Sequence, residues 1–245
     1  MWKYIILLII YVILVFKEQN MAVEKKTLTQ LSVPICLETL FYMLSGMVDT
    51  LMLSSVSDQA VGAVGTANTY IGVFIIMFGV ISSGMVAVMS QNIGAGKRQR
   101  ANETLRYAVM ITVGFGIIVG IFMQFFASPV VALFTDASDA SGAEVVRLGG
   151  QYLRGYVWDC MFAGIHFSFS GYFCACGLSN IPFMNNFISI LAVRIPVAYM
   201  ASKFFTASLF PMGLASPLGS LLSVFISVIA YMWLKQHPEK VMLNI

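Results

Sequence analysis

Four polar side chains recur at helical spacing in an otherwise apolar stretch near the start of the chain. They are separated by four, three and four residues, so a helix places them on nearly one face. A charged carboxylate inside a bilayer costs at least ~2.5 kcal/mol, so this face must meet protein or water rather than lipid. An acid in that setting can bind and release a proton or a cation. Alternatively, the two acids lie at the two membrane interfaces and are simply solvated. The residues are Glu38, Tyr42, Ser45 and Asp49.

A second polar stripe falls later in the chain, at intervals of seven, seven and four residues. Asp159 and His166 stand two helical turns apart on it. An acid and a histidine at this spacing either relay protons, hold a cation, or form a hydrogen-bonded structural pair. The sequence leaves these alternatives open. The stripe consists of Tyr152, Asp159, His166 and Ser170.

A single arginine interrupts the apolar stretch at residues 185–200, NNFISILAVRIPVAYM. The guanidinium of Arg194 is permanently charged and lies well inside its apolar run. We therefore expect Arg194 to pair with an acid or to line a polar cavity. Asp159 is the partner that the sequence offers.

The segment 60–70, AVGAVGTANTY, brings small and hydrogen-bonding residues into the second apolar stretch. Gly62 and Gly65 fall on one helix face, where the lack of a side chain lets a neighbouring helix approach closely. Asn68 follows with an amide that needs hydrogen-bond partners inside the membrane. We interpret the glycines as packing residues and predict that Asn68 lines a cavity.

Metal and enzyme chemistry have little support in the sequence. The two histidines, His166 and His237, have no HExxH or comparable cluster around them. The four cysteines stand inside or at the edges of apolar runs, and the one Cys-x-Cys pair has no further ligand nearby. We interpret them as small buried hydrophobic residues. The sequence therefore predicts a protein that is not an enzyme and holds no metal or cofactor. The cysteines are Cys36, Cys160, Cys174 and Cys176.

The composition places the chain in a membrane. Of its 245 residues, 59% are hydrophobic and 10% are charged, against roughly 25% charged in a soluble domain. The net charge of +3 comes mostly from short basic clusters, a pattern typical of loops at an anionic membrane surface and not of a nucleic-acid face. A span needs about 20 helical residues, so the sequence predicts an all-α bundle of six transmembrane helices. Their predicted bounds are 29–53, 58–94, 107–135, 144–176, 182–205 and 211–234.

Loop charges orient these helices. Lys and Arg mark the cytoplasmic side, and they cluster before the first span and after the second and sixth, whereas acids follow the first and third. Both ends of the six-helix block are therefore expected in the cytoplasm. The stretch SQNIGAGKRQR lacks the GxxxxGK[ST] spacing of a phosphate loop, and we interpret it as a helix stop with a cytoplasmic anchor. The basic residues include Lys25, Lys26, Lys97, Arg98, Arg100, Arg106, Lys235 and Lys240, and the acids are Asp58, Asp136 and Asp139.

The chain divides into three predicted parts: an apolar segment with a basic linker at 1–26, the six-helix domain at 27–236 and a cytoplasmic tail at 237–245. The first stretch, MWKYIILLIIYVILVF, extends about 22 Å as a helix, which is short for a span. It also lacks the small-residue cleavage site of a signal peptide. It is either a signal anchor or an interfacial helix, or translation begins at Met21.

Several stretches together resemble one family. LSVPICLETLFYMLSGMVDTLMLSSVSDQAVGAVGTANTY and ISSGMVAVMSQNIGAGKRQRA are similar to the opening two helices of the multidrug and toxic compound extrusion (MATE) transporters. GQYLRGYVWDCMF through GYFCACGLSNIPFMNN, with VRIPVAYM, resembles the closing part of the same family's repeat. The resemblance covers about residues 27–236. It implies a fold equivalent to one six-helix lobe of a two-lobe transporter.

The resemblance further implies an antiporter, coupled to protons or sodium, that exports amphipathic or cationic organic compounds. Asp49, in GMVDT, matches the family's coupling carboxylate, whereas the acid usual on the fifth helix of the first lobe has no match beside Arg194 and Pro196. The expected partners are membrane lipid, a small organic substrate and either a homodimer or a second half-transporter, in the plasma (inner) membrane. The alternatives are an inactive fragment of a full-length transporter, or a lipid-linked sugar flippase, which would need a more cationic cavity.

Overall fold

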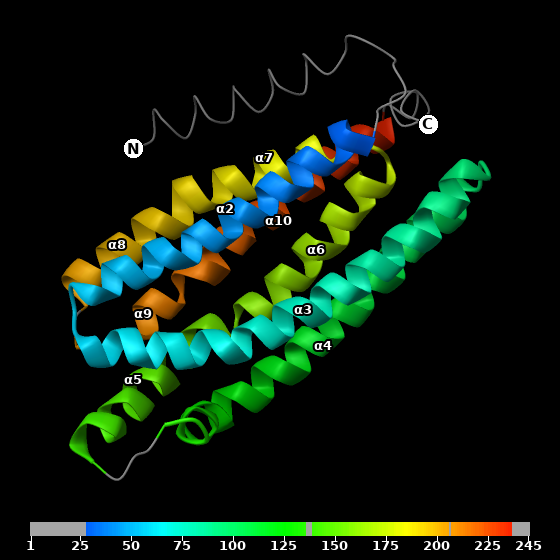
Figure 1. Cartoon of the computed structure of the whole chain (residues 1–245). Helices are drawn as coiled ribbons and strands as arrows, with labels where there is room; N and C mark the ends of the chain where they lie inside the picture. The colour runs from blue at the N-terminus through cyan, green and yellow to red at the C-terminus, as the bar shows by residue number, and fades with distance from the viewer. Residues whose placement is uncertain (1–27, 136–138, 206, 237–245) are drawn as a thin grey trace.

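The computed structural model describes residues 28–135, 139–205 and 207–236, and every regular element in this part is a helix (Figure 1). The predicted segment at 1–26 and the predicted tail at 237–245 lie outside the described residues. The helices are α2 (Leu28–Ser54), α3 (Asp58–Gly94), α4 (Arg98–Ala132), α5 (Ala140–Tyr156), α6 (Asp159–Ala175), α7 (Asn180–Ser189), the π-helical turn η1 (Ile190–Arg194), α8 (Ile195–Phe204), α9 (Phe210–Gly213) and α10 (Ala215–Gln236).

The predicted all-helical membrane fold is confirmed, with one correction to its spans. Five of the six predicted spans correspond to segments that are long and apolar enough to cross a membrane. The predicted fourth span, 144–176, is instead two 17-residue helices, α5 and α6, which meet at Val157 and Trp158. The first of them carries an exposed ion pair, Glu144 with Arg147, which suits a water-facing surface. The five segments are Thr29–Ser54, Asp58–Gly94, Arg98–Ala132, Asn180–Phe204 and Phe210–Gln236.

α3 is one uninterrupted helix of 37 residues, about 55 Å long, compared with ~30 Å for the hydrocarbon core of a bilayer. The Ser57 hydroxyl caps its start by accepting a hydrogen bond from the Ala60 N–H at 3.0 Å. The helix ends at Gly94, as predicted. Gly96 follows with a φ of 73°, in the left-handed region that glycine adopts without strain, and Arg98 begins α4. The helix stop predicted at this segment is therefore confirmed.

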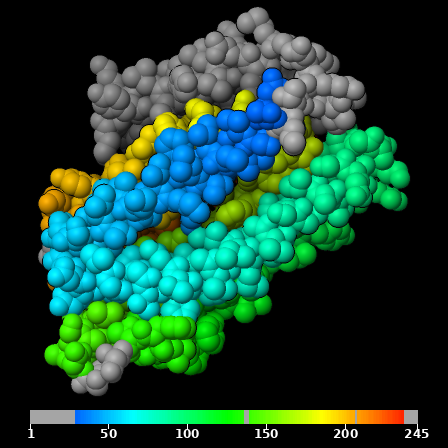
Figure 2. All heavy atoms as spheres, in the orientation of Figure 1, coloured from blue at the N-terminus to red at the C-terminus, as the bar shows by residue number. Residues whose placement is uncertain are grey.

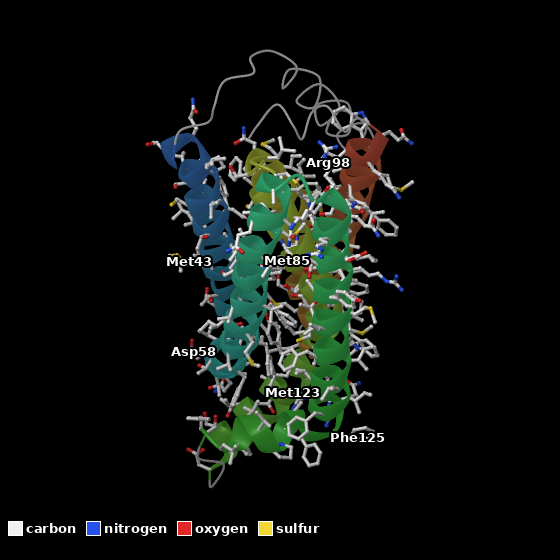
Figure 3. All side chains as sticks on the ribbon, turned by 90° about the vertical axis from the view of Figure 1, so that its right-hand side faces the viewer. Met43, Asp58, Met85, Arg98, Met123 and Phe125 are labelled. Carbon is white, nitrogen blue, oxygen red and sulfur yellow. The ribbon has the colours of Figure 1, made fainter. Side chains whose placement is uncertain are left out.

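The helices form two groups joined by α6. α3 and α4 lie along each other, with Arg98 at one end of the pair and Asp58 toward the other (Figure 3). α2, α7, α8 and α10 form the second group (Figure 1). α6 packs against α3 and α4 on one side and against α10 on the other, and α5 packs across the ends of α3 and α4. In the space-filling view, α2 and α3 form neighbouring ridges on one face (Figure 2).

Large apolar side chains point outward as well as inward. Met85 and Met123 lie between the helices and are 5% and 3% exposed, whereas Met43 and Phe125 stand on outer faces and are 65% and 73% exposed (Figure 3). Water would penalise such an outer surface, but lipid does not. The outer faces of α2 and α4 therefore fit contact with lipid.

Two packing predictions need correction. Gly62 and Gly65 are exposed, and a Cβ built at Gly65 meets nothing within 4 Å, so these glycines do not mediate the packing of α3. The prediction that all four cysteines are buried holds for Cys160 and Cys176 but not for Cys36, which is exposed on α2, and Cys174 is half-buried. The buried small residues of this part of α3 are instead alanines one helical stripe away. They are Ala60, Ala63 and Ala67.

Gly116 allows α4 to approach α6 closely. A Cβ added at Gly116 would lie 2.6 Å from the carbonyl oxygen of Cys160 and 3.0 Å from the Cα of Met161. Both neighbours are backbone atoms, so neither can give way without moving α6. Gly114, two residues earlier on the same helix, has open space around it.

We predict that Gly116→Ala lowers the melting temperature of the purified protein in detergent, because α4 and α6 must separate to admit the methyl group. Gly114→Ala is the matched control, and it should leave the melting temperature unchanged or raise it, since alanine favours a helix by up to about 1 kcal/mol over glycine. Thermal unfolding followed by tryptophan fluorescence measures both. Equal melting temperatures for the two variants would contradict the close packing of these helices.

Candidate functional site

A cavity of about 480 Å³ lies between α2, α3, α6, α10 and the segment formed by α7 and η1. Parts of the two polar stripes predicted from the sequence line it together. Glu38 and Tyr42 enter from α2, Asp159 and His166 enter from α6, and Arg194 enters from η1. The volume falls in the range of about 300–1,000 Å³ that small-molecule sites occupy. Residues far apart in sequence therefore meet in one polar cavity inside the bundle.

Arg194 forms an ion pair with Asp49. Its Nη2 donates to Oδ2 of Asp49 at 2.9 Å, and the two side chains are 11% and 9% exposed. The guanidinium also lies over the Tyr42 ring, 5.6 Å from the centroid. The prediction that Arg194 pairs with Asp159 is therefore wrong in this structure. The reason is that α2 packs against α7 and α8 and so brings Asp49 to the arginine from behind the cavity lining.

A local change in helix winding positions Arg194. Residues Ile190–Arg194 form a π-helical turn, in which the N–H of Ile195 donates to the carbonyl of Ile190, five residues back. Pro196 accounts for this winding, because proline has no N–H and its ring clashes with the carbonyl four residues earlier. Gly219 of α10 packs against the turn, and a Cβ added there would lie 3.3 Å from the Cβ of Arg194.

The charges around Arg194 do not balance. Counted over the whole residue, Asp49, Asp159 and Arg194 are 6%, 5% and 9% exposed. When ionised they carry two negative charges and one positive charge. One polar atom of each lacks a hydrogen-bond partner among the described residues: Oδ1 of Asp49, Oδ1 of Asp159 and Nε of Arg194. Each such buried atom costs about 1–3 kcal/mol, and more when it is charged. With all three groups ionised, this end of the cavity therefore carries one net negative charge, which one further positive charge would neutralise.

A second group of polar side chains joins four helices, and it begins in the same cavity and continues into the packed interior beside it. Nδ1 of His166 lies 2.6 Å from the Ser223 hydroxyl, and Nε2 of His166 lies 3.6 Å from Oε1 of Glu38. Asn185 donates to the Ser223 carbonyl at 3.0 Å and to the Ser227 hydroxyl at 2.7 Å. The histidine is thus held on one nitrogen by α10 and meets an acid of α2 on the other.

Three predicted site residues lie outside the lining of this cavity: Asp49, which contacts Arg194, Ser45 and Asn68. Ser45 is buried on α2, and its hydroxyl has no hydrogen-bond partner among the described residues. Asn68 is half-buried on α3, and its predicted place in a cavity stays a prediction. It shares a helical stripe with Ile75, which does line the cavity, but it stands two turns closer to the start of α3, beyond the end of the cavity.

A row of serines on α10 belongs to the site and was missed from the sequence. These serines are spaced by four, three and four residues, the same intervals as the polar stripe of α2. That spacing was the available signal. It is weak for serine, because a helical serine commonly bonds to its own backbone and then needs no polar neighbour. The row consists of Ser216, Ser220 and Ser223, which line the cavity, and Ser227, which is buried beyond it.

An all-helical bundle that encloses a polar, charged cavity inside the membrane is the architecture of a secondary transporter. The MatE family model matches residues 34–200, and the chain therefore belongs to the MatE family. Its helices superpose on those of a Vibrio cholerae MATE transporter, VcmN in the bent form, with a TM-score of 0.76, 18% identity, 88% coverage of this chain and 47% of the other. A MOP superfamily transporter from Pyrococcus furiosus gives a TM-score of 0.68 at 17% identity, with 83% and 43% coverage.

Two curated bacterial proteins are similar over shorter stretches. An uncharacterized transporter of Bacillus subtilis, YisQ, is 40% identical over 77 residues, which are 31% of this chain and 17% of that protein. A Shewanella oneidensis protein named as an FAD transporter is 29% identical over 120 residues, 49% of this chain and 26% of its own length. The chain spans about half the length of the solved transporters that it matches and covers a smaller share of these two relatives. The predicted resemblance to one MATE lobe is confirmed.

We predict that Arg194→Leu destabilises the protein by about 3 kcal/mol, because it leaves the carboxylate of Asp49 buried without a counter-charge. The double variant Asp49→Leu with Arg194→Leu should recover most of that loss. Arg147→Leu breaks the exposed pair with Glu144 and is the matched control, with little expected change because that pair is solvated. Thermal unfolding in detergent measures all three. Equal effects of Arg194→Leu and Arg147→Leu would show that the Asp49 pair is not desolvated.

Proposed function

We propose that this chain is the membrane-embedded half of an ion-coupled antiporter that exports amphipathic or cationic organic compounds. Membership of the MatE family supports membrane transport. The observation that carries the proposal is the acidic character of the cavity. Glu38 and Asp159 line it, while the one cation among its described lining residues, Arg194, is already paired with Asp49. Tyr42 and Phe167 add aromatic surface suited to an organic cation.

Asp49 is the proposed coupling residue, and its ion is a proton or sodium. A carboxylate held by a guanidinium has two stable arrangements inside the membrane. Either it keeps the arginine, or it takes a small cation after the arginine withdraws. Coupling at Asp49 therefore requires that the ion compete with Arg194, which is a constraint that an unpaired acid would not impose.

The cavity's charge argues against anionic cargo. A lipid-linked sugar carries phosphate, and a flippase for it needs free cationic groups in the cavity. FAD, for which the Shewanella relative is named, also carries two phosphates. Because the positive charge of Arg194 is neutralised by Asp49, two acids dominate the remaining lining. A cationic substrate fits this lining better than either anionic one.

The proposed setting is the plasma (inner) membrane, with both ends of the helical block in the cytoplasm. Arg98 at the start of α4 and Lys235 at the end of α10 line one small pocket, so two of the basic loops meet at the same end of the bundle. This clustering supports the orientation, since cytoplasmic loops carry the excess of Lys and Arg. We further propose that alternating access uses a second six-helix body, supplied by a second copy of this chain or by another half-transporter. Lipid covers the remaining outer faces.

The test is ethidium accumulation in cells that lack their own dye export, expressing the chain alone or as a covalently linked tandem of two copies. We expect lower dye accumulation with the active form, and Asp49→Asn should abolish export at unchanged membrane levels because its amide binds no coupling ion. Asp58→Asn changes an exposed acid at the start of α3 and is the matched control, with export expected to continue.

The export results distinguish a transporter that needs a second body, a transporter not coupled at Asp49, and an inactive fragment. Export by the tandem but not by the single chain identifies the second body as the missing requirement. Equal export by the wild-type protein and Asp49→Asn would remove Asp49 from the coupling site. No export in either format would favour the inactive-fragment reading.

A further inference from the structure

Two acids share one arginine at the inner end of the cavity. Arg194 is ion-paired with Asp49. Asp159 lines the cavity and is only 5% exposed, and its Oδ1 has no hydrogen-bond partner among the described residues. A carboxylate this deeply buried is stable only when it gains a positive charge or a proton. Asp159 lines the cavity and Asp49 does not, so Asp159 is the carboxylate that a ligand in the cavity would meet.

Arg194 and Asp159 are close neighbours through α10. A Cβ added at Gly219 would lie 3.3 Å from the Cβ of Arg194, and the next residue, Ser220, lies beside Asp159. Tyr42 links the same groups on the other side, because its ring faces the guanidinium and its hydroxyl lies 3.5 Å from that of Tyr156, which also neighbours Asp159. An arginine side chain has several rotatable bonds, so a reorientation of the guanidinium from Asp49 toward Asp159 is the movement that the proposal requires.

We propose that Asp159 is the binding site for the positive charge of the transported compound, and that Arg194 makes this site and the ion site at Asp49 mutually exclusive. With Arg194 on Asp49, Asp159 is free and takes the organic cation. When a proton or sodium ion occupies Asp49, Arg194 turns to Asp159 and displaces that cation. One guanidinium between two acids thus allows one external positive charge at a time, and such exclusive occupancy is the thermodynamic requirement of an antiporter.

The surroundings of Asp159 favour an organic monovalent cation. The opening toward the cavity is lined by aromatic and small residues rather than by further carboxylates at one point, which a divalent ion would need. The other titratable groups that face this region are an acid and a histidine at the far part of the cavity and three tyrosines around the arginine. They are Glu38, His166, Tyr42, Tyr152 and Tyr156, with the thiols of Cys160 beside Asp159 and Cys174 in the cavity lining. None of them is a permanently charged cation.

This inference rests on the proposed function and deepens it by naming the substrate site. The test measures binding of tetraphenylphosphonium to the full chain in nanodiscs, because this probe carries a permanent charge and any effect of pH then comes from the protein. Binding is measured over pH 6–8, and with sodium chloride replaced by potassium chloride at constant ionic strength. Size-exclusion profiles and melting temperatures confirm that each variant is folded.

Four variants give distinct expectations. Asp159→Asn should weaken binding by about tenfold or more, since it removes a buried charge partner. Asp49→Asn should also weaken it about tenfold, because the released Arg194 then occupies Asp159. Arg194→Gln should bind the probe and lose the competition by the coupling ion. The double variant Asp49→Asn with Arg194→Gln should regain binding, because no arginine is left to occupy Asp159.

The double variant is decisive. Rescue of binding shows that Asp49→Asn acted through Arg194. Failure of the rescue, with both proteins folded, would overturn the exclusive arrangement, and so would unchanged binding in Asp159→Asn. If the wild-type protein binds no tetraphenylphosphonium under any condition while the folded state is intact, the cationic substrate class itself fails, and the proposed function falls together with this inference.

Discussion

The ion pair between Asp49 and Arg194 is the interaction on which the site depends. It joins α2 to η1 inside a bundle that otherwise gains its cohesion from apolar packing and close backbone contacts. Two desolvated charges at 2.9 Å attract each other strongly, but removing them from water costs several kcal/mol per ion. The pair is therefore poor as a pure stabiliser. In the proposed mechanism its role is exchange, because replacing Arg194 by another cation at Asp49 would redistribute a large electrostatic free energy.

The backbone around this pair is built to hold an arginine in the membrane. Pro196 interrupts the regular hydrogen bonding, the π-helical turn absorbs the interruption, and the arginine stands at the end of that turn. Gly219 leaves space for the stem of the side chain on α10. Tyr42 then covers one face of the guanidinium from α2. A lysine at this position would offer neither the planar face for the ring nor several donors in a fixed geometry.

The fold could be predicted from the sequence because the apolar runs, which are its strongest signals, extend over many residues. Runs of apolar residues longer than a bilayer requires have one structural solution, a helix, and the polar stripes of α2 and α6 follow from helical spacing alone. The sequence could not predict which acid pairs with Arg194. Asp49 and Asp159 both lie at plausible depths, and the choice depends on how α2 packs on α7 and α8. The break before Asp159 was also missed, since no proline marks it. Asn68 shares a helical stripe with the cavity residue Ile75, but its position along the helix axis places it outside this cavity, and helical spacing does not predict that depth.

The break between α5 and α6 links the fold to the chemistry. Because α6 begins at Asp159, this carboxylate stands in the first turn of a helix, where the helix dipole favours negative charge. An unbroken span across 144–176 would have placed the same acid in mid-helix without that effect. The backbone does not complete the site, because the N–H of Cys160 bonds to the Val157 carbonyl at 3.1 Å and Oδ1 of Asp159 has no hydrogen-bond partner among the described residues. A cation bound at Asp159, as proposed above, would supply the missing partner.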